Sequence, residues 1–215
     1  MTVEDLIGMV LISLISYLIG SISFATIFSK KIKGIDPREH GSHNPGATNV
    51  LRTAGIKAAI LTLLFDLAKG IIVVLFAVFL SKWTNMNNGY ILPQLAAFFV
   101  IFGHMFPVYY KFKGGKGIAT GIGVIFVLNW QIGLIVIVFA LLVMLLSRYV
   151  SLGSISGAVL YFVLTIFLTD ANIVIGPRLP YILNALLIAS LIVFKHRDNI
   201  KRLRENEENK ISFKK

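Results

Sequence analysis

The chain contains no cysteine, and few of its 215 residues are charged. The absence of cysteine excludes disulfide frameworks, thiolate metal sites and cysteine nucleophiles. Charged residues make up 14% and apolar residues 56% of the sequence, whereas a water-soluble domain carries about 25% charged residues. With a mean hydropathy of +0.81, the composition predicts an integral membrane protein.

The charge that is present is mostly positive, with 21 Lys and Arg against 10 Asp and Glu. Because the long apolar runs leave no room for a soluble nucleic-acid-binding domain, we expect no nucleic-acid partner and place the basic excess at the membrane edges, beside lipid headgroups. The N-terminus carries Glu4 and Asp5. It lacks the positive segment and cleavage site of a signal peptide, which indicates a retained first span.

Long apolar runs predict the membrane spans, since a bilayer core of about 30 Å requires roughly 20 apolar residues in a helix. The candidate runs are residues 6–28, 57–80, 91–110, 117–146, 152–169 and 180–194. The fourth run is too long for one span and contains the polar triplet 129–131, so we divide it there. The sequence then predicts one all-α membrane domain over residues 1–215, with seven transmembrane helices.

Basic residues give an independent test of this division, because they concentrate in loops on the cytoplasmic side of a membrane. With seven spans and the N-terminus outside, all of the 21 Lys and Arg residues except Lys69, Lys82 and Arg178 face the cytoplasm or its membrane edge. Six spans would place the basic C-terminal tail outside. The polar sequence then falls into three cytoplasmic segments, at about 29–56, 111–117 and 195–215.

The first polar segment contains GSHNPGATNVLRTAG at residues 41–55, with small hydroxyl and amide side chains such as Ser42, Asn44 and Asn49. Such a segment exposes backbone N–H groups that can bind an anion, and Arg52 can contact phosphate through two parallel N–H donors. The alternative is a cytoplasmic turn followed by the start of a helix, with an Asn or Thr cap.

The second polar segment lies within GHMFPVYYKFKGGKGIAT, residues 103–120, in which Gly114 and Gly115 precede Lys116. Glycine leaves backbone donors unobstructed and the ammonium adds charge, as in phosphate-binding loops, although the Walker A pattern is absent. An ordinary loop is the alternative. His104, near the end of an apolar run, is either a functional ionisable group or a hydrogen-bonded structural histidine.

The third polar segment is FKHRDNIKRLRENEENK, in which His196 and Asn199 lie three residues apart. On a helix that leaves the membrane, these two residues share one face. The alternative is an ordinary basic helix attracted to anionic lipid headgroups. Judged by residue type alone, the acidic cluster that includes Glu208 is expected to be solvated.

Two smaller features lie within or beside the apolar runs. Asp66 and Lys69, three residues apart, can pair inside the helix bundle, which reduces the cost of two charges in the membrane; we interpret this pair as structural. Ser151 and Ser154 either donate hydrogen bonds into a site or pack between helices as small residues.

The segments, in this order, closely resemble the bacterial acyl-phosphate:glycerol-3-phosphate acyltransferases, the PlsY family. The matching motifs cover nearly the whole chain and are YLIGSISFA, GSHNPGATNVLR, DLAKG, GHMFPVYYKFKGGKGIAT, SLGS and HRDNIKRL. The resemblance implies seven transmembrane helices, an external N-terminus and a site on the cytoplasmic side of the bacterial cell membrane. It also implies transfer of a fatty acyl group from acyl phosphate to the 1-hydroxyl of glycerol 3-phosphate, which forms lysophosphatidic acid and phosphate.

Carried over position by position, the resemblance implies Ser42, His196 and Asn199 as catalytic residues. The implied substrate-binding residues are Asn44, Asn49, Arg52, Gly114, Gly115, Lys116, Ser154 and Glu208. The chain departs from the family pattern at two positions, where His43 and Asn206 stand in place of a usual glycine. We expect the first departure to alter the loop conformation and the second to weaken the role of the carboxylate that follows it.

An acyl phosphate is already activated, so the site needs to hold two anions, aim a hydroxyl and stabilise the developing charge. The sequence shows no His-x4-Asp pair and no compelling Ser-His-Asp order. We therefore expect direct transfer without a covalent intermediate, metal or cofactor, with His196 or a substrate phosphate as proton acceptor. The rival function is an organic-phosphate or anion transporter, which the one-sided gathering of the polar segments disfavours.

Overall fold

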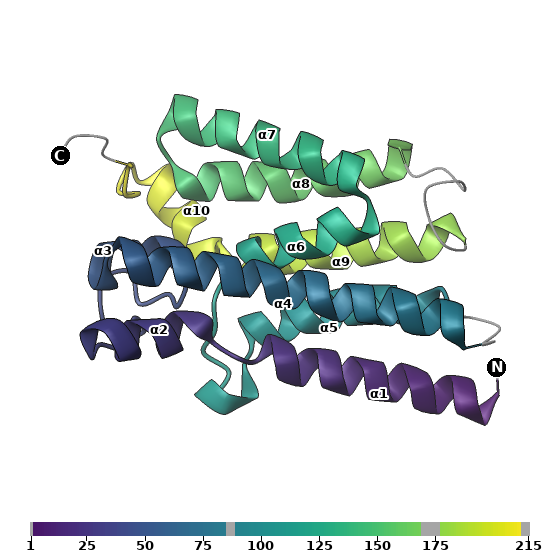
Figure 1. Ribbon diagram of the computed structural model, residues 1–215. Helices are drawn as coiled ribbons and strands as arrows, with labels where there is room; N and C mark the ends of the chain where they lie inside the picture. The colour runs from purple at the N-terminus through teal and green to yellow at the C-terminus, as the bar shows by residue number, and fades with distance from the viewer. Residues whose placement is uncertain (1, 85–88, 169–176, 212–215) are drawn as a thin grey trace. The chain divides into compact units, whose positions relative to one another are not determined.

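The computed structural model describes residues 2–84, 89–168 and 177–211, and all regular elements in these ranges are helical. The chain divides into two compact units, residues 1–128 and 129–215, coloured purple to teal and green to yellow in Figure 1. The described helices include six that are long and apolar enough to cross a membrane.

Unit 1 is built around α4, which packs against α3, α5 and α6, while α1 lies along α5. Its elements are α1 (Val3–Gly20), α2 (Phe24–Lys33), α3 (Ala47–Ala54), α4 (Ile56–Trp83), α5 (Ile91–Met105), the 3-10 turn η1 (Val108–Tyr110) and α6 (Ile118–Leu128). The α1 and α5 backbones approach closely. A Cβ on Gly20 would lie 2.2 Å from the carbonyl oxygen of Val100, so a side chain at this position would force the helices apart.

The first apolar run, predicted as a span over residues 6–28, lies within the candidate span Val3–Lys33, but its helix is interrupted. α1 ends at Gly20, and α2 begins at Phe24. Ser23 caps the new helix, because its hydroxyl accepts a hydrogen bond of 3.3 Å from the backbone N–H of Thr26. A serine inside an apolar run was thus the local signal of a helix start.

The interruption leaves backbone carbonyls without helical partners, and Lys69 of α4 provides donors for them. Its Nζ lies 3.1 Å from the carbonyl oxygen of Gly20 and 2.9 Å from that of Ile22. The same ammonium lies 2.7 Å from Asp66 Oδ1, which confirms the predicted pairing. Since unpaired carbonyls are costly in an apolar environment, Lys69 stabilises the break in the first span.

The predicted division of the fourth apolar run is confirmed. α6 ends at Leu128, and α7 (Trp130–Ser147) begins after Asn129. The Asn129 side-chain oxygen accepts a hydrogen bond of 3.0 Å from Ile132 N, so the asparagine acts as an N-cap. With 11 residues, α6 is about 16 Å long, roughly half of a bilayer core.

Unit 2 consists of α7, α8 (Val150–Leu168), α9 (Arg178–Lys195) and α10 (Arg197–Arg204). α8 packs against both α7 and α9. The segment after α10 returns to the turn between α7 and α8, where the backbone N–H of Ile211 donates to the carbonyl of Arg148 at 2.8 Å. This return brings the end of the third polar segment next to the start of α8.

Candidate functional site

The first polar segment forms a loop that leads into α3, and Asn49 holds the loop from inside. Its side chain is 1% exposed. The amide nitrogen donates to the carbonyls of Pro37 (2.8 Å) and His40 (3.0 Å), and the amide oxygen accepts from Ser42 N (2.9 Å). Asn49 therefore shapes the loop, a role beside the ligand role that the family resemblance implies.

The loop presents polar groups to its surroundings at the start of α3. Ser42 and Arg52 are exposed and Asn44 is half-buried. α3 starts at Ala47 after Gly46, and no side chain caps it. Backbone N–H groups of an uncapped first turn and a guanidinium are groups that bind anionic oxygens. The segment can therefore receive a phosphate.

His43, one of the two departures from the family pattern, has a φ of 56°. In this left-handed region glycine is favoured, and histidine is among the residues that tolerate it. The ring Nδ1 lies 3.1 Å from the carbonyl oxygen of Arg38, which holds the residue in place. The backbone conformation suited to glycine is thus kept, and the expected change of loop conformation is not needed to accommodate histidine.

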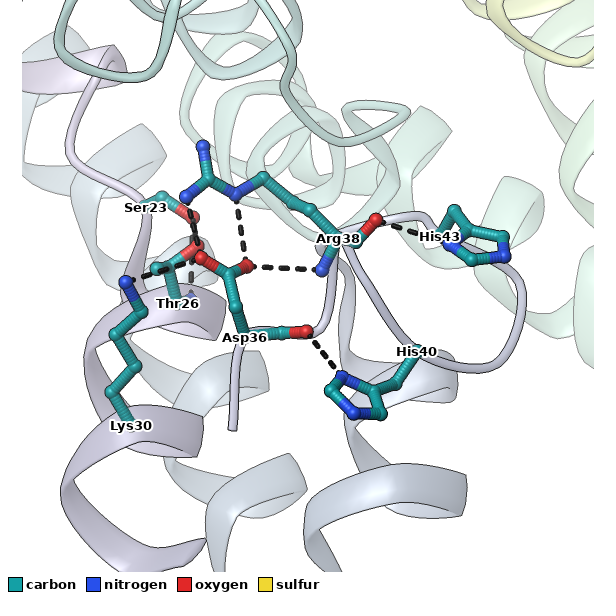
Figure 2. Close-up of polar contacts among 7 residues, drawn as sticks. All are labelled: Ser23, Thr26, Lys30, Asp36, Arg38, His40 and His43. Carbon is teal, nitrogen blue, oxygen red and sulfur yellow. Dashed lines mark hydrogen bonds and ion pairs between the residues drawn. The ribbon is translucent and has the colours of Figure 1, made fainter. Parts of the chain in front are cut away.

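Asp36 ties the loop to α2, a contact that the sequence did not single out. Lys30 Nζ lies 3.2 Å from its carboxylate, and Arg38 Nε lies 2.9 Å from the same carboxylate. Figure 2 draws both contacts. The Arg38 guanidinium, whose hydrogen bonds outweigh burial, holds the pKa of Asp36 far below its ordinary value. It also lies over the Tyr110 ring, 4.8 Å from the centroid. α2, the loop and η1 are thereby joined.

The second polar segment lies directly against the end of α5. Gly115 N donates to the carbonyl of His104 at 3.1 Å. A Cβ on Gly114 would lie 2.2 Å from that same oxygen, and one on Gly115 would lie 3.1 Å from the carbonyl oxygen of Pro45. The contact with Pro45 brings the first and second segments together within unit 1. Lys116 follows immediately and is half-buried.

The third polar segment lies in unit 2 and is not one continuous helix, which corrects the expectation for its start. His196 separates α9 from α10, and its Nδ1 lies 2.8 Å from the carbonyl oxygen of Ile192. Asn199 follows in the first turn of α10. Both side chains are buried, so they are held in fixed positions.

The interpretation of Glu208 as a solvated charge is wrong. Its side chain is 8% exposed. It accepts hydrogen bonds from Asn199 Nδ2 (2.7 Å), Ser151 Oγ (3.0 Å) and Arg202 Nε (2.8 Å). Burial alone would raise the pKa of this carboxyl, but the three donors outweigh burial and lower it. Glu208 is therefore an ionised carboxylate, and it orients the Asn199 amide.

Asn206, the second departure from the family pattern, has a φ of 59°. Asparagine tolerates this left-handed conformation better than most residues do. The chain can therefore turn after α10 and return Glu208 to its three donors without glycine. The expected weakening of Glu208 is not seen in these hydrogen bonds.

The two serines of the SLGS motif differ in their partners. Ser151 Oγ donates to Glu208, whereas Ser154 Oγ donates to the carbonyl of Val150 in its own helix, at 2.9 Å. The structure thus connects Ser151, which the family resemblance did not select, to the third segment. A ligand role for Ser154 stays a prediction.

Comparisons with known proteins bear on the whole chain. Residues 10–206 match the family model described as glycerol-3-phosphate acyltransferase. A protein of that name from Thermoanaerobacter sp. strain X514 is 43% identical over 206 residues, 95% of this chain and 96% of the relative. One from Coxiella burnetii strain RSA 493 is 42% identical over 200 residues, 93% of this chain and 96% of the relative.

Solved structures agree with these relatives. The crystal structure of PlsY, an integral membrane glycerol 3-phosphate acyltransferase, in its glycerol 3-phosphate form has a TM-score of 0.82 at 34% identity, covering 95% of this chain and 96% of that one. Its lysophosphatidic acid form has a TM-score of 0.81 at 33% identity, covering 95% of both chains. The predicted all-α integral membrane fold is thereby confirmed.

Glu208 gives a pH-dependent test of the network in unit 2. Because the folded protein lowers the pKa of this carboxyl, its contribution to stability is complete above the ordinary value of 4.5 and is lost as the pH falls through the lowered pKa. We expect Glu208→Gln to cost about 2 kcal/mol at neutral pH, the typical value for hydrogen bonds to a charged group. Thermal unfolding in detergent should show this cost shrinking in acid. Glu207→Gln, at an exposed neighbour, is the control, and an equal effect of both substitutions would contradict the prediction.

Proposed function

The chain belongs to the glycerol-3-phosphate acyltransferase family, and from this premise we propose that it transfers a fatty acyl group from acyl phosphate to the 1-hydroxyl of sn-glycerol 3-phosphate. The hydroxyl oxygen attacks the acyl carbonyl carbon, the bond between that carbon and the phosphate oxygen breaks, and lysophosphatidic acid and phosphate leave. The solved PlsY structures in glycerol 3-phosphate and lysophosphatidic acid forms support the acceptor and the product.

The observation that carries this proposal is the contact between the first two polar segments at Pro45 and Gly115. It brings the uncapped start of α3 and the glycine segment before Lys116 into one part of unit 1. The first contributes the N–H groups of an uncapped helix start and the Arg52 guanidinium, and the second contributes the Lys116 ammonium. Two anionic substrates require such donors, because phosphate oxygens must be held while the acyl carbon is attacked.

In unit 1 we assign phosphate binding to Arg52, Lys116 and the backbone of Gly114 and Gly115. Arg52 presents a planar fork of donors, and Lys116 a single ammonium. Ser42, which is exposed beside α3, orients a substrate oxygen. Asn44 and Asn49 complete the substrate-binding residues of the first polar segment. Asn49 acts mainly by shaping the loop.

In unit 2 we assign the alignment of substrate oxygens to His196, Asn199 and Ser154. The Glu208 carboxylate accepts a hydrogen bond from one N–H of the Asn199 amide and fixes the direction of that amide. The proton of the attacking hydroxyl passes to His196 or to a substrate phosphate, and no covalent acyl-enzyme forms. The function of an anion transporter, kept open by the sequence, is not favoured, because the relatives are named as acyltransferases.

For the membrane we propose seven spans, with α6 as the short one, in the bacterial inner membrane. An external N-terminus then puts the three polar segments on the cytoplasmic side, where most Lys and Arg residues are expected. α6 leads from the second polar segment to Asn129, and a helix of about 16 Å crosses only where the bilayer is thinned or protein lines the rest of the path.

The donor is the sharpest test of the function. We expect purified protein in detergent to form lysophosphatidic acid from acyl phosphate and glycerol 3-phosphate, and not from acyl-CoA or acyl-carrier protein. No soluble domain that could bind an adenine nucleotide or a carrier protein is seen in residues 2–84, 89–168 and 177–211. The measurement compares product formation at equal acyl concentration without phosphotransacylase. Comparable rates with acyl-CoA would show that the donor is wrong.

Arg52 tests phosphate binding. Because a hydrogen bond to a charged group contributes roughly 1.5–3 kcal/mol, Arg52→Ala should lower kcat/KM by about one order of magnitude or more. Arg52→Lys should restore it only in part, since an ammonium lacks the two-pronged geometry. Lys57→Ala, at an exposed cation in the first turn of α4, is the control. Unchanged kinetics in folded Arg52→Ala would remove Arg52 from the site.

Topology can be measured by cysteine labelling, because the chain has no cysteine of its own. Lys82→Cys and Trp130→Cys should react with an impermeant reagent added outside the cell, and Ser42→Cys and Lys210→Cys should not. All four positions are exposed. External labelling of Lys210→Cys would show an even number of spans.

A further inference from the structure

A buried polar cluster lies beneath the glycine segment in unit 1. Lys69 Nζ is 2.7 Å from Asp66 Oδ1 and 3.0 Å from His104 Nδ1. The three side chains are at most 8% exposed. Lys69 also binds the carbonyls at the break between α1 and α2. The Lys69–Asp66 pair thus stabilises the break between α1 and α2. The histidine contacts this pair through only one edge of its ring.

The contacts with Lys69 and Asp66 fix the orientation of the histidine ring. An ammonium paired with a carboxylate has N–H groups to donate and no lone pair to offer. The 3.0 Å contact with Lys69 is joined by a 3.5 Å contact between the same Nδ1 and Asp66 Oδ1, so the ion pair holds the Nδ1 edge of the ring from both its members. The ring is held in one orientation from one side.

The other ring edge faces the glycine segment. A Cβ on Gly115 would lie 2.2 Å from His104 Nε2, and Gly115 N donates to the His104 carbonyl at 3.1 Å. His104 thus meets the segment through both its ring and its backbone. Lys116 is the next residue, so the path of the backbone around Gly115 sets where the Lys116 ammonium begins.

We propose that His104 is a positioning residue for acyl transfer: clamped by Lys69 and Asp66, its Nε2 edge supports the Gly114–Gly115 backbone so that Lys116 stands in place to bind a substrate phosphate. The proposal rests on the proposed function. His104 touches no reacting atom in this role. Its loss is therefore felt first in substrate binding and less in the chemical step.

Kinetics of two conservative variants test the proposal. Glutamine extends its amide to the Nε2 position, whereas asparagine keeps an acceptor facing Lys69 but ends short of Gly115. We expect His104→Asn and His104→Ala to raise the KM for glycerol 3-phosphate about tenfold with kcat within about threefold, and His104→Gln to stay within about threefold of the wild type. Tyr109→Ala, in η1 and 58% exposed, is the control. Full activity of His104→Asn would overturn the proposal, since a histidine that served only Lys69 would give that result.

The clash distance allows a second kinetic test. Gly115→Ala should impair binding because the new methyl group meets the ring. In the double variant with His104→Ala the ring is absent, so binding should be no weaker than in Gly115→Ala alone. If the double variant showed the product of the two single-variant losses in binding, direct support of Gly115 by the ring would be contradicted.

A readout without turnover separates this proposal from the proposed function. Hydrogen exchange of a peptide spanning residues 113–118 should be several-fold faster in His104→Ala and His104→Asn than in the wild type and His104→Gln. Inorganic phosphate should protect the segment in the latter two only. If the wild type formed no lysophosphatidic acid, the proposed function would fall while the exchange rates still decided the role of His104. Unchanged exchange in His104→Ala would overturn that role.

Discussion

The Lys69 ammonium is the group on which the arrangement of unit 1 depends. It occupies the break between α1 and α2, where the carbonyls of Gly20 and Ile22 have lost their helical partners, and it is paired with Asp66. In the low dielectric of a membrane, neither an unpaired carbonyl nor an unpaired cation is tolerated cheaply. The hydrogen bonds between the Lys69 ammonium and these carbonyls satisfy both groups. The chain can then change direction inside an apolar run, and α2 delivers the first polar segment to the end of α5.

The two helix breaks show what the sequence can predict and what it cannot. The break at Asn129 is visible locally, because a run too long for one span contains a polar triplet whose asparagine can cap a helix. The break after Gly20 depends on donors from Lys69, 49 positions away along the chain. Ser23 is a local signal of the new helix start, but no local pattern reports a partner at that distance, and Ser21, Ile22 and Ser23 do not interrupt a hydropathy profile.

In the candidate site, too, local features could be predicted from the sequence and distant partners could not. The three polar segments were found from composition, since glycine, amide and basic residues stand out in an apolar chain. Residue type alone predicted a solvated Glu208, because the type does not show its three donors, one of which, Ser151, lies 57 positions earlier. The departures at His43 and Asn206 could be judged only from φ, which is 56° and 59°. Residue identity indicates which groups are available, whereas the backbone conformation decides whether an unusual residue fits.

The division at Asn129 also has a consequence for how the protein is made. Both units are contiguous in sequence, and the contacts that shape the first two polar segments, from Lys69 to Gly115, all precede residue 129. At about 5–20 residues per second, the ribosome needs on the order of ten seconds to add the rest of the chain. Unit 1 can therefore assemble in the membrane while unit 2 is still being translated. When a substitution prevents this early assembly, the unassembled part of the chain is exposed to membrane proteases before α7 has been synthesised.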